Sequence, residues 1–321
     1  YDDPGNRRFH AQPNACQVCG PHVSLIRSVG NPVDGDPIAG TIALLKAGHI
    51  LAIKGLGGFH LAVDAQNPEA VSRLRQRKHR EEKPFALMAP NTQAIGRFAQ
   101  LTDPDQELLV SARRPIVLLP KKQPNAIAPD VAPRNRYFGV MLPYTPLHYL
   151  LLEGEFTALV MTSANISEEP ICIDNAEALN RLGDIADYFL TNNRDIYLRS
   201  DDSIVRYTEG AARLIRRSRG YVPVPVFLKH TLPAVLACGA ELKNTICLTK
   251  GKNAFVSQHI GDLENLATYQ FFQLTIDHMQ RILDVTPEIL ACDMHPDYLS
   301  TRHAMQQTRL PVCHVQHHHA H

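Results

Sequence analysis

Short apolar runs and helical stretches alternate along most of the chain. Residues 49–55, HILAIKG, are an apolar run that leads into glycines, which predicts a strand. Residues 40–48, GTIALLKAG, predict a helix that ends at Gly48. Residues 158–162 predict another strand, which is followed by a polar loop. Strands that alternate with helices from about residue 35 to 225 predict an α/β domain with a twisted mixed sheet.

A strongly basic helix is predicted within this domain. Asn67 is the expected N-cap, Pro68 suits the first helical position, and Pro84 is the expected end. The stretch RLRQRKHREEK inside it carries six cations: Arg73, Arg75, Arg77, Lys78, Arg80 and Lys83. Cations at a helix C-terminus often only face water, but they could also clamp a polyphosphate. We expect Arg75 to lie on the solvated face.

The pattern changes after a proline-rich stretch, residues 222–233, which is the best candidate for a linker. Residues 234–261 predict three short strands joined by AELKN and KGKN turns. Residues 263–285 predict one long amphipathic helix. Its apolar stripe comprises Leu266, Tyr269, Phe272, Ile276, Met279 and Leu283. A strand, a helix and a strand follow in residues 288–316, and the order βββαβαβ is that of the ribonuclease-H-like half of actin-type folds.

Composition narrows the class of protein. A length of 321 residues predicts about two domains. The net charge of +1 argues against broad nucleic-acid binding. No apolar run approaches the roughly 20 residues of a membrane span, and the opening YDDPGNRRFHAQ is no signal peptide. The odd number of cysteines, 7, fits a reducing cytoplasm, and a start at Tyr1 rather than Met indicates a fragment.

Three further polar sets accompany the basic helix. Lys54 precedes three glycines in KGLGGFH, and Ser163 and Asn165 lie just past a predicted strand end, where α/β folds bind ligands. The last set consists of Arg199, Asp201, Asp202, Arg216, Arg217 and Arg219. Each set is weak by itself, but four in one domain indicate a nucleotide with its phosphates.

Two patterns suggest metal ions. Cys16 and Cys19 form a CxxC pair, half of a four-ligand zinc site, with no second half visible before Cys172. A redox pair is the alternative, but no predicted strand leads into it. Near the end, His317 and His321 are four residues apart and would share one helix face, as metal ligands do. A purification tag is the alternative interpretation of this histidine run.

Taken together, eight stretches resemble the HypF carbamoyltransferase family of nickel–iron hydrogenase maturation. They are RRFHAQPNACQVCGP, KGLGGFHLAVDA, RKHREEKPFALM, TSANISEEPI, RSDDSIVR, RRSRGYVPVP, CGAELKNTICL and VQHHHAH, in the family's order. The resemblance implies the end of a zinc finger in residues 1–30, a YrdC-like domain in 31–225 and the start of a TsaD-like (Kae-like) domain in 226–321. An acylphosphatase domain, a first finger and the rest of the TsaD-like domain are expected to be missing.

The resemblance also implies roles for residues. The family's catalytic cations fall on Lys54, Lys78, Arg80 and Lys83, and its nucleotide-binding residues on Ser163, Asn165, Arg199 and either Arg216 or Arg217. The sequence leaves that last choice open, because RRSRG departs from the shorter Arg-Pro-Gly of stand-alone YrdC proteins. Cys16 and Cys19 would bind zinc, and His317 with His321 a divalent metal.

The implied reaction joins carbamate, made from carbamoyl phosphate, to ATP with Mg²⁺. The carbamoyl group of the resulting carbamoyl adenylate would pass to the C-terminal cysteine of HypE, towards the cyanide ligands of the nickel–iron centre. No membrane or nucleic-acid partner is expected. A threonylcarbamoyl-adenylate synthase of tRNA modification is the runner-up, because it shares the YrdC chemistry. A zinc-dependent nucleic-acid-binding module is the third interpretation.

Overall fold

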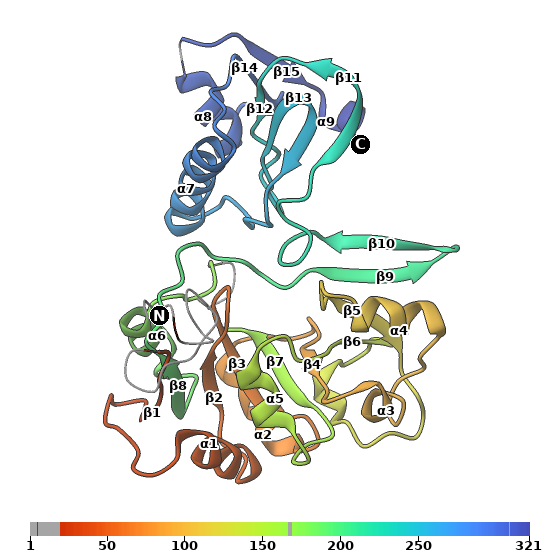
Figure 1. Cartoon of the computed structure of the whole chain (residues 1–321), viewed down its shortest axis with the longest axis vertical. Helices are drawn as coiled ribbons and strands as arrows, with labels where there is room; N and C mark the ends of the chain where they lie inside the picture. Colours follow the sequence, from red (N-terminus) through yellow and green to blue (C-terminus); the bar gives the residue numbers. More distant parts are fainter. Residues whose placement is uncertain (1–4, 6–19, 166–168, 308) are drawn as a thin grey trace.

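A computed structural model describes residues 5, 20–165, 169–307 and 309–321. It contains a ten-stranded sheet, formed by the first two thirds of the chain, and a five-stranded sheet formed by the rest. In Figure 1 the smaller sheet lies at the top. The β9–β10 hairpin, which is one edge of the larger sheet, lies in the middle, and the rest of the larger sheet lies below.

The larger sheet has the order β1-β8-β2-β3-β7-β4-β6-β5-β9-β10 with mixed strand directions. Its strands are β1 (Val23–Arg27), β2 (Leu51–Lys54), β3 (Phe59–Asp64), β4 (Ala86–Met88), β5 (Ile116–Pro120), β6 (Tyr137–Met141), β7 (Leu159–Ser163), β8 (Tyr188–Asn192), β9 (Ile204–Thr208) and β10 (Ala211–Arg216). The helices are α1 (Pro37–Lys46), α2 (Pro68–Arg77), α3 (Thr92–Ile95), α4 (Asp103–Val110), α5 (Pro146–Leu152), α6 (Asn175–Leu182) and the 3₁₀ turn Pro129–Val131.

Helices cover the two faces of this sheet unequally. Along β3, Phe59, Leu61 and Val63 pack into one core with α2, α4 and α6, while Ala62 between them packs into a second core with α1 and α5. The alternation follows from the two-residue period of a strand. The second face is left open beyond α1 and α5, and a cavity lies there.

Local signals place α2 as expected at its start but not at its end. The Asn67 side chain accepts from the Ala70 N–H at 3.0 Å, as an N-cap does. The helix ends at Arg77, seven residues before Pro84. His79 adopts a φ of 49°, in the left-handed region, which ends the helical ladder earlier than proline requires.

The second sheet has the order β11-β13-β12-β14-β15, with β12, β14 and β15 parallel. Its elements are β11 (Val226–Leu232), β12 (Val235–Ala237), β13 (Cys247–Val256), α7 (Leu266–Leu283), β14 (Ile289–Asp293), α8 (Leu299–Gln306), β15 (Val312–Val315) and α9 (His317–Ala320). The structure has three strands, then helix, strand, helix and strand, as predicted, but residues 234–261 hold two of these strands, β12 and β13, rather than three. A further helix begins at the histidine run.

Three details of the prediction for this part are wrong. Most of the supposed linker is β11, which pairs with β13 as the edge of the sheet. The KGKN stretch is no turn between strands, because β13 continues through it, with Gly251 at a φ of 61°. Leu266 is 71% exposed as the first residue of α7, whereas Phe272, Ile276 and Met279 are buried. None of the helices in the described ranges is long and apolar enough to cross a membrane.

Candidate active site

The loop after α2 carries the central cations of the site. Lys78 caps the helix and His79 turns the chain, so Arg80 and Lys83 lie on the loop rather than on the helix. Lys78, Arg80 and Lys83 all line one cavity of about 360 Å³. The structure therefore brings these three predicted residues together.

Arg75 supports this loop instead of facing solvent. Its guanidinium donates to the carbonyl oxygen of Arg80 at 2.7 Å and to that of Asp130 at 2.9 Å. Its Cζ also lies 4.5 Å from the centre of the Phe85 ring. The expectation that Arg75 faces solvent is wrong. An Arg75→Ala variant would remove contacts that support the loop, so it cannot serve as a neutral control for a Lys83→Ala variant.

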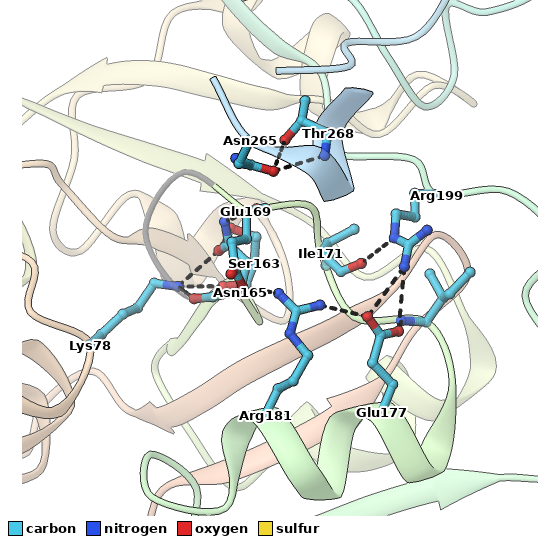
Figure 2. Close-up of polar contacts among 11 residues, drawn as sticks. Lys78, Ser163, Asn165, Glu169, Ile171, Glu177, Arg181, Arg199, Asn265 and Thr268 are labelled. Atoms are coloured by element: carbon cyan, nitrogen blue, oxygen red, sulfur yellow. Dashed lines mark hydrogen bonds and ion pairs between the residues drawn. The ribbon is translucent and has the colours of Figure 1, made fainter. Parts of the chain in front are cut away.

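Lys78 is buried beside the end of β7. Its Nζ donates to the carbonyl oxygen of Ser163 at 3.0 Å and to Oδ1 of Asn165 at 2.9 Å (Figure 2). The Ser163 hydroxyl donates to the same Oδ1 at 3.0 Å. Burial, together with the nearby charges of Arg80 and Lys83, lowers the pKa of Lys78 to about 7. An anion in the cavity would raise it again, so Lys78 is prepared for a phosphate.

Arg199 also lines the cavity, but acidic partners already balance its charge. Its Nε donates to the carbonyl oxygen of Ile171 at 2.9 Å, and its Nη2 lies 3.2 Å from Oε1 of Glu177. Arg181 pairs with Glu177 and with Glu169 at the edge of the same cluster (Figure 2). Arg199 thus holds the wall of the cavity more than it adds free positive charge.

Arg216 and Arg217 have different surroundings. Arg216 lines the cavity. The Arg217 guanidinium donates to the carbonyl oxygen of Val256 at 2.6 Å, to that of Tyr221 at 3.0 Å and to that of Val224. Arg216 is thus the one placed to meet a ligand, and Arg217 links the end of β10 to the second sheet.

Lys54 does not join the other cations. It is 3% exposed, and its Nζ lies 3.4 Å from the carbonyl oxygen of Asn192 and 6.0 Å from the centre of the Phe59 ring. Its attractive partners are Asp195 and Asp174, and Lys54 does not line this cavity. The expected convergence of Lys54 with Lys78 is therefore not observed.

A second cavity, of about 330 Å³, adjoins the first over the open face of the larger sheet. The two share Arg80, Lys83, Ser163, Ile171, Asp201 and Arg216. The second is mostly apolar, with side chains from β4 to β7 and β9, among them Ile116, Met161 and Tyr137. A row of cations thus lies between a polar hollow and an apolar one, an arrangement that fits a charged group attached to a flat apolar one.

Asp202 and Arg219, which the sequence places in one polar set, belong to a buried polar cluster with His60, Tyr144 and His148. Its Oδ1 accepts from Nε of Arg219 at 2.7 Å, and its Oδ2 lies 3.1 Å from Nε2 of His60. The Arg219 guanidinium stacks 3.6 Å from the centre of the Tyr144 ring. His148, fully buried beside them, has its pKa lowered to about 3 by desolvation. The cluster draws on four separate segments, so no local pattern could have paired Asp202 and Arg219 with His60, Tyr144 and His148.

The second sheet has its own cavity of about 400 Å³, lined by residues of β12, β14 and the start of α9. His317 and His321 both line it, with ring centres 5.0 Å apart. Nδ1 of His317 lies 2.7 Å from Oδ2 of Asp293, an orientation that leaves Nε2 as the nitrogen for a ligand. No group of three or more potential ligands is found among the described residues. Cys16 and Cys19 lie outside the described residues.

Comparison with known proteins identifies the family. The family model described as "HypF finger" matches residues 1–26, that of the Sua5, YciO and YrdC proteins ("Telomere recombination") matches 43–218, and the "HypF Kae1-like domain" matches 230–321. The chain belongs to the HypF carbamoyltransferase family. This family assignment and the fold class predicted from the sequence are confirmed.

Similar HypF proteins cover the chain almost completely. It is 49% identical to carbamoyltransferase HypF2 of Cupriavidus necator, over 93% of this chain and 40% of that protein. It is also 49% identical to carbamoyltransferase HypF of Synechocystis, over 86% of this chain and 36% of that protein. A crystal structure of full-length HypF "in the phosphate- and nucleotide-bound form" superposes with a TM-score of 0.93 and 49% identity, over 100% of this chain and 42% of that one. The chain thus spans about two fifths of its HypF relatives.

Proposed function

We propose that this chain activates carbamate with ATP as part of a HypF-type carbamoyltransferase. Residues 1–30 would be the end of a zinc finger, 31–225 the domain that forms carbamoyl adenylate, and 226–321 part of the domain that transfers the carbamoyl group. The observation that carries the proposal is the row of cations shared by a polar and an apolar cavity. The polar cavity would hold the phosphates and the apolar one the nucleoside.

The reaction requires charge neutralisation and positioning. A carbamate oxygen attacks the α-phosphorus of ATP, the bond from that phosphorus to the bridging oxygen breaks, and pyrophosphate leaves with the electron pair. Lys78, Arg80 and Lys83 would offset the charge that builds up on the phosphates, and Arg216 would close over them. Ser163, Asn165 and Arg199 would hold the wall against which the nucleotide lies. Mg²⁺ would enter with ATP. Lys54 has no place in this scheme, because it lines neither of the two cavities.

The transfer step would use the cavity of the second sheet. His317 and His321 offer two imidazoles, and Asp293 holds the His317 ring in place, so the described residues would supply two of the ligands of a divalent metal. Such an ion supplies Lewis acidity towards oxygen ligands when bound. The acceptor in this proposal is the C-terminal cysteine of HypE, on the way to the cyanide ligands of the nickel–iron centre. Zinc at Cys16 and Cys19 would be structural.

A threonylcarbamoyl-adenylate synthase remains the alternative, because the chain is also 28% identical, over 46% of its length, to a threonylcarbamoyl-AMP synthase of Photobacterium profundum. Matches to HypF models on both sides of that region favour carbamate as the substrate. A nucleic-acid-binding module is disfavoured by the net charge of +1.

We expect this chain to exchange labelled pyrophosphate into ATP when carbamate is supplied. Threonine with bicarbonate should not support exchange, and stronger exchange with threonine would favour the alternative. Carbamoylation of the HypE cysteine by the 321-residue chain alone should be absent, because the chain spans about two fifths of its HypF relatives. If this chain modified that cysteine as fast as a full-length HypF protein, the assignment of transfer to the His317 and His321 site would be wrong.

We expect Arg216→Ala and Arg217→Ala to have different consequences. Loss of Arg216 should weaken ATP binding about tenfold, because one charge-assisted contact to phosphate disappears. Loss of Arg217 should instead lower the unfolding temperature, since three backbone carbonyls lose their donor. Calorimetry with ATP and a thermal melt of each variant measure both effects. Equal ATP affinities for wild type and Arg216→Ala would contradict the placement of Arg216.

A further inference from the structure

One wall of the polar cavity comes from the second sheet and its connections. Lys243, His259, Asp262, Thr268 and Phe271 line the cavity that Lys78, Arg80 and Lys83 line from the other side. None of these five residues belongs to the stretch, residues 43–218, that matches the YrdC-type family model. The site that the first domain provides is therefore bounded by a second domain.

Two paired loops make this wall rigid. Asn244 donates its N–H to the carbonyl oxygen of Gly261 at 2.9 Å, and Ile260 donates to that of Asn244 at 2.9 Å. The Lys243 N–H donates to the Asp262 carboxylate, so this carboxylate is held by the opposite loop of the pair. Gly261 has a φ of 116°, a conformation that suits glycine. Lys243 and His259 are thus carried by a preorganised frame.

The frame is hydrogen-bonded to Arg217, the neighbour of the cavity-lining Arg216. His259 donates its N–H to the carbonyl oxygen of Arg217 at 3.0 Å, and the Arg217 guanidinium donates to the carbonyl oxygen of Val256. Arg216, directly before this joint, lines the cavity with His259. Hydrogen bonds across the domain boundary therefore help to position both Arg216 and His259.

The surroundings of His259 suit an anionic ligand. Two cations, Lys83 and Arg216, and two carboxylates, Asp201 and Asp262, act on its ring. Burial lowers the pKa of His259, which favours the neutral imidazole. A neutral imidazole still donates one N–H, and it adds no repulsion to the neighbouring cations. It can therefore bind phosphate oxygens beside Lys83 and Arg216 without adding to their charge.

We propose that His259, with Lys243 beside it, binds the pyrophosphate that leaves during adenylation, so that the second domain completes the adenylating site of the first. This inference rests on the proposed function. The attacked phosphorus would lie near the first-domain cations, and the departing group would lie towards the wall formed by the second domain.

Binding of magnesium pyrophosphate to the 321-residue chain tests this directly by calorimetry. We expect His259→Ala to weaken binding about tenfold, the value of one charge-assisted hydrogen bond. His259→Gln, which keeps an N–H donor, should lose less, and Lys243→Ala should also weaken binding. The matched control is His230→Ala, an exposed histidine on β11 outside the cavity lining, which should bind as wild type does.

The following outcomes decide whether His259 binds pyrophosphate. Unchanged pyrophosphate affinity in His259→Ala, or no binding by the wild-type chain, would overturn the inference. An equal loss in His230→Ala would also overturn it, because the effect would then not belong to the cavity. Selective loss in His259→Ala supports it, even if carbamate-dependent exchange is absent from the wild type, a result that would count against the proposed function alone.

Discussion

Lys78→Met is expected to reduce carbamate-dependent pyrophosphate exchange at least about 100-fold, as removal of a single preorganised donor from an active site commonly does. Methionine matches the length of the lysine stem and suits its buried position, so the fold should survive. Lys122→Met is the matched control, because Lys122 is exposed and only donates to the carbonyl oxygen of Gly96. Exchange within threefold of wild type in Lys78→Met would remove Lys78 from the proposed mechanism.

The pH dependence of stability gives an independent check on Lys78. Its pKa is about 7 in the folded chain against an ordinary value of 10.5, so between these values the unfolded chain binds a proton that the folded chain lacks. The free energy of unfolding should therefore rise with pH across this window, by up to about 1.4 kcal/mol per unit from this group. Lys78→Met should lack that increment. Urea titrations of both proteins at pH 7 and pH 9 measure the difference.

Asp202→Asn is expected to destabilise the larger domain by about 3 kcal/mol, because it leaves the buried Arg219 guanidinium without its counter-charge. The loss should appear as a lower urea midpoint of unfolding. Glu82→Gln is the control: Glu82 also pairs with an arginine, Arg134, but the two side chains are 69% and 86% exposed, so its loss should cost under about 1 kcal/mol. Equal midpoints for Asp202→Asn and wild type would show that the cluster around Asp202 contributes nothing to stability.

The Asp202 carboxylate should also affect the stability of the protein at low pH. Burial opposes ionisation of Asp202, but the hydrogen bond from His60 and the charges of His60 and Arg219 outweigh it and hold the pKa of Asp202 well below its ordinary value of 3.8. A depressed folded pKa stabilises the protein above the unfolded value, and this contribution is lost as the pH falls towards the folded value. The wild type should therefore lose stability below about pH 4, whereas Asp202→Asn should lack this part of the decline.

The cations of the site show what could be predicted from the sequence and what could not. The basic run after Asn67 identified Lys78, Arg80 and Lys83, which do line one cavity. The same run could not show that Arg75 supports the loop through the Asp130 carbonyl oxygen, a contact across 55 residues of sequence. Side-chain direction at a helix end depends on what packs against it, and sequence periodicity carries no information about that partner.

The sequence by itself determined the order of the elements, the cap at Asn67 and the family, because each depends on side chains within a few residues or on motifs in a fixed order. Only the tertiary structure decided that Arg216 rather than Arg217 meets the cavity, that Lys54 lies elsewhere, and that His259 closes the site from the second sheet. These outcomes depend on contacts between segments far apart in the chain. Such contacts are set by the packing of whole sheets and helices, which no short stretch of residues encodes.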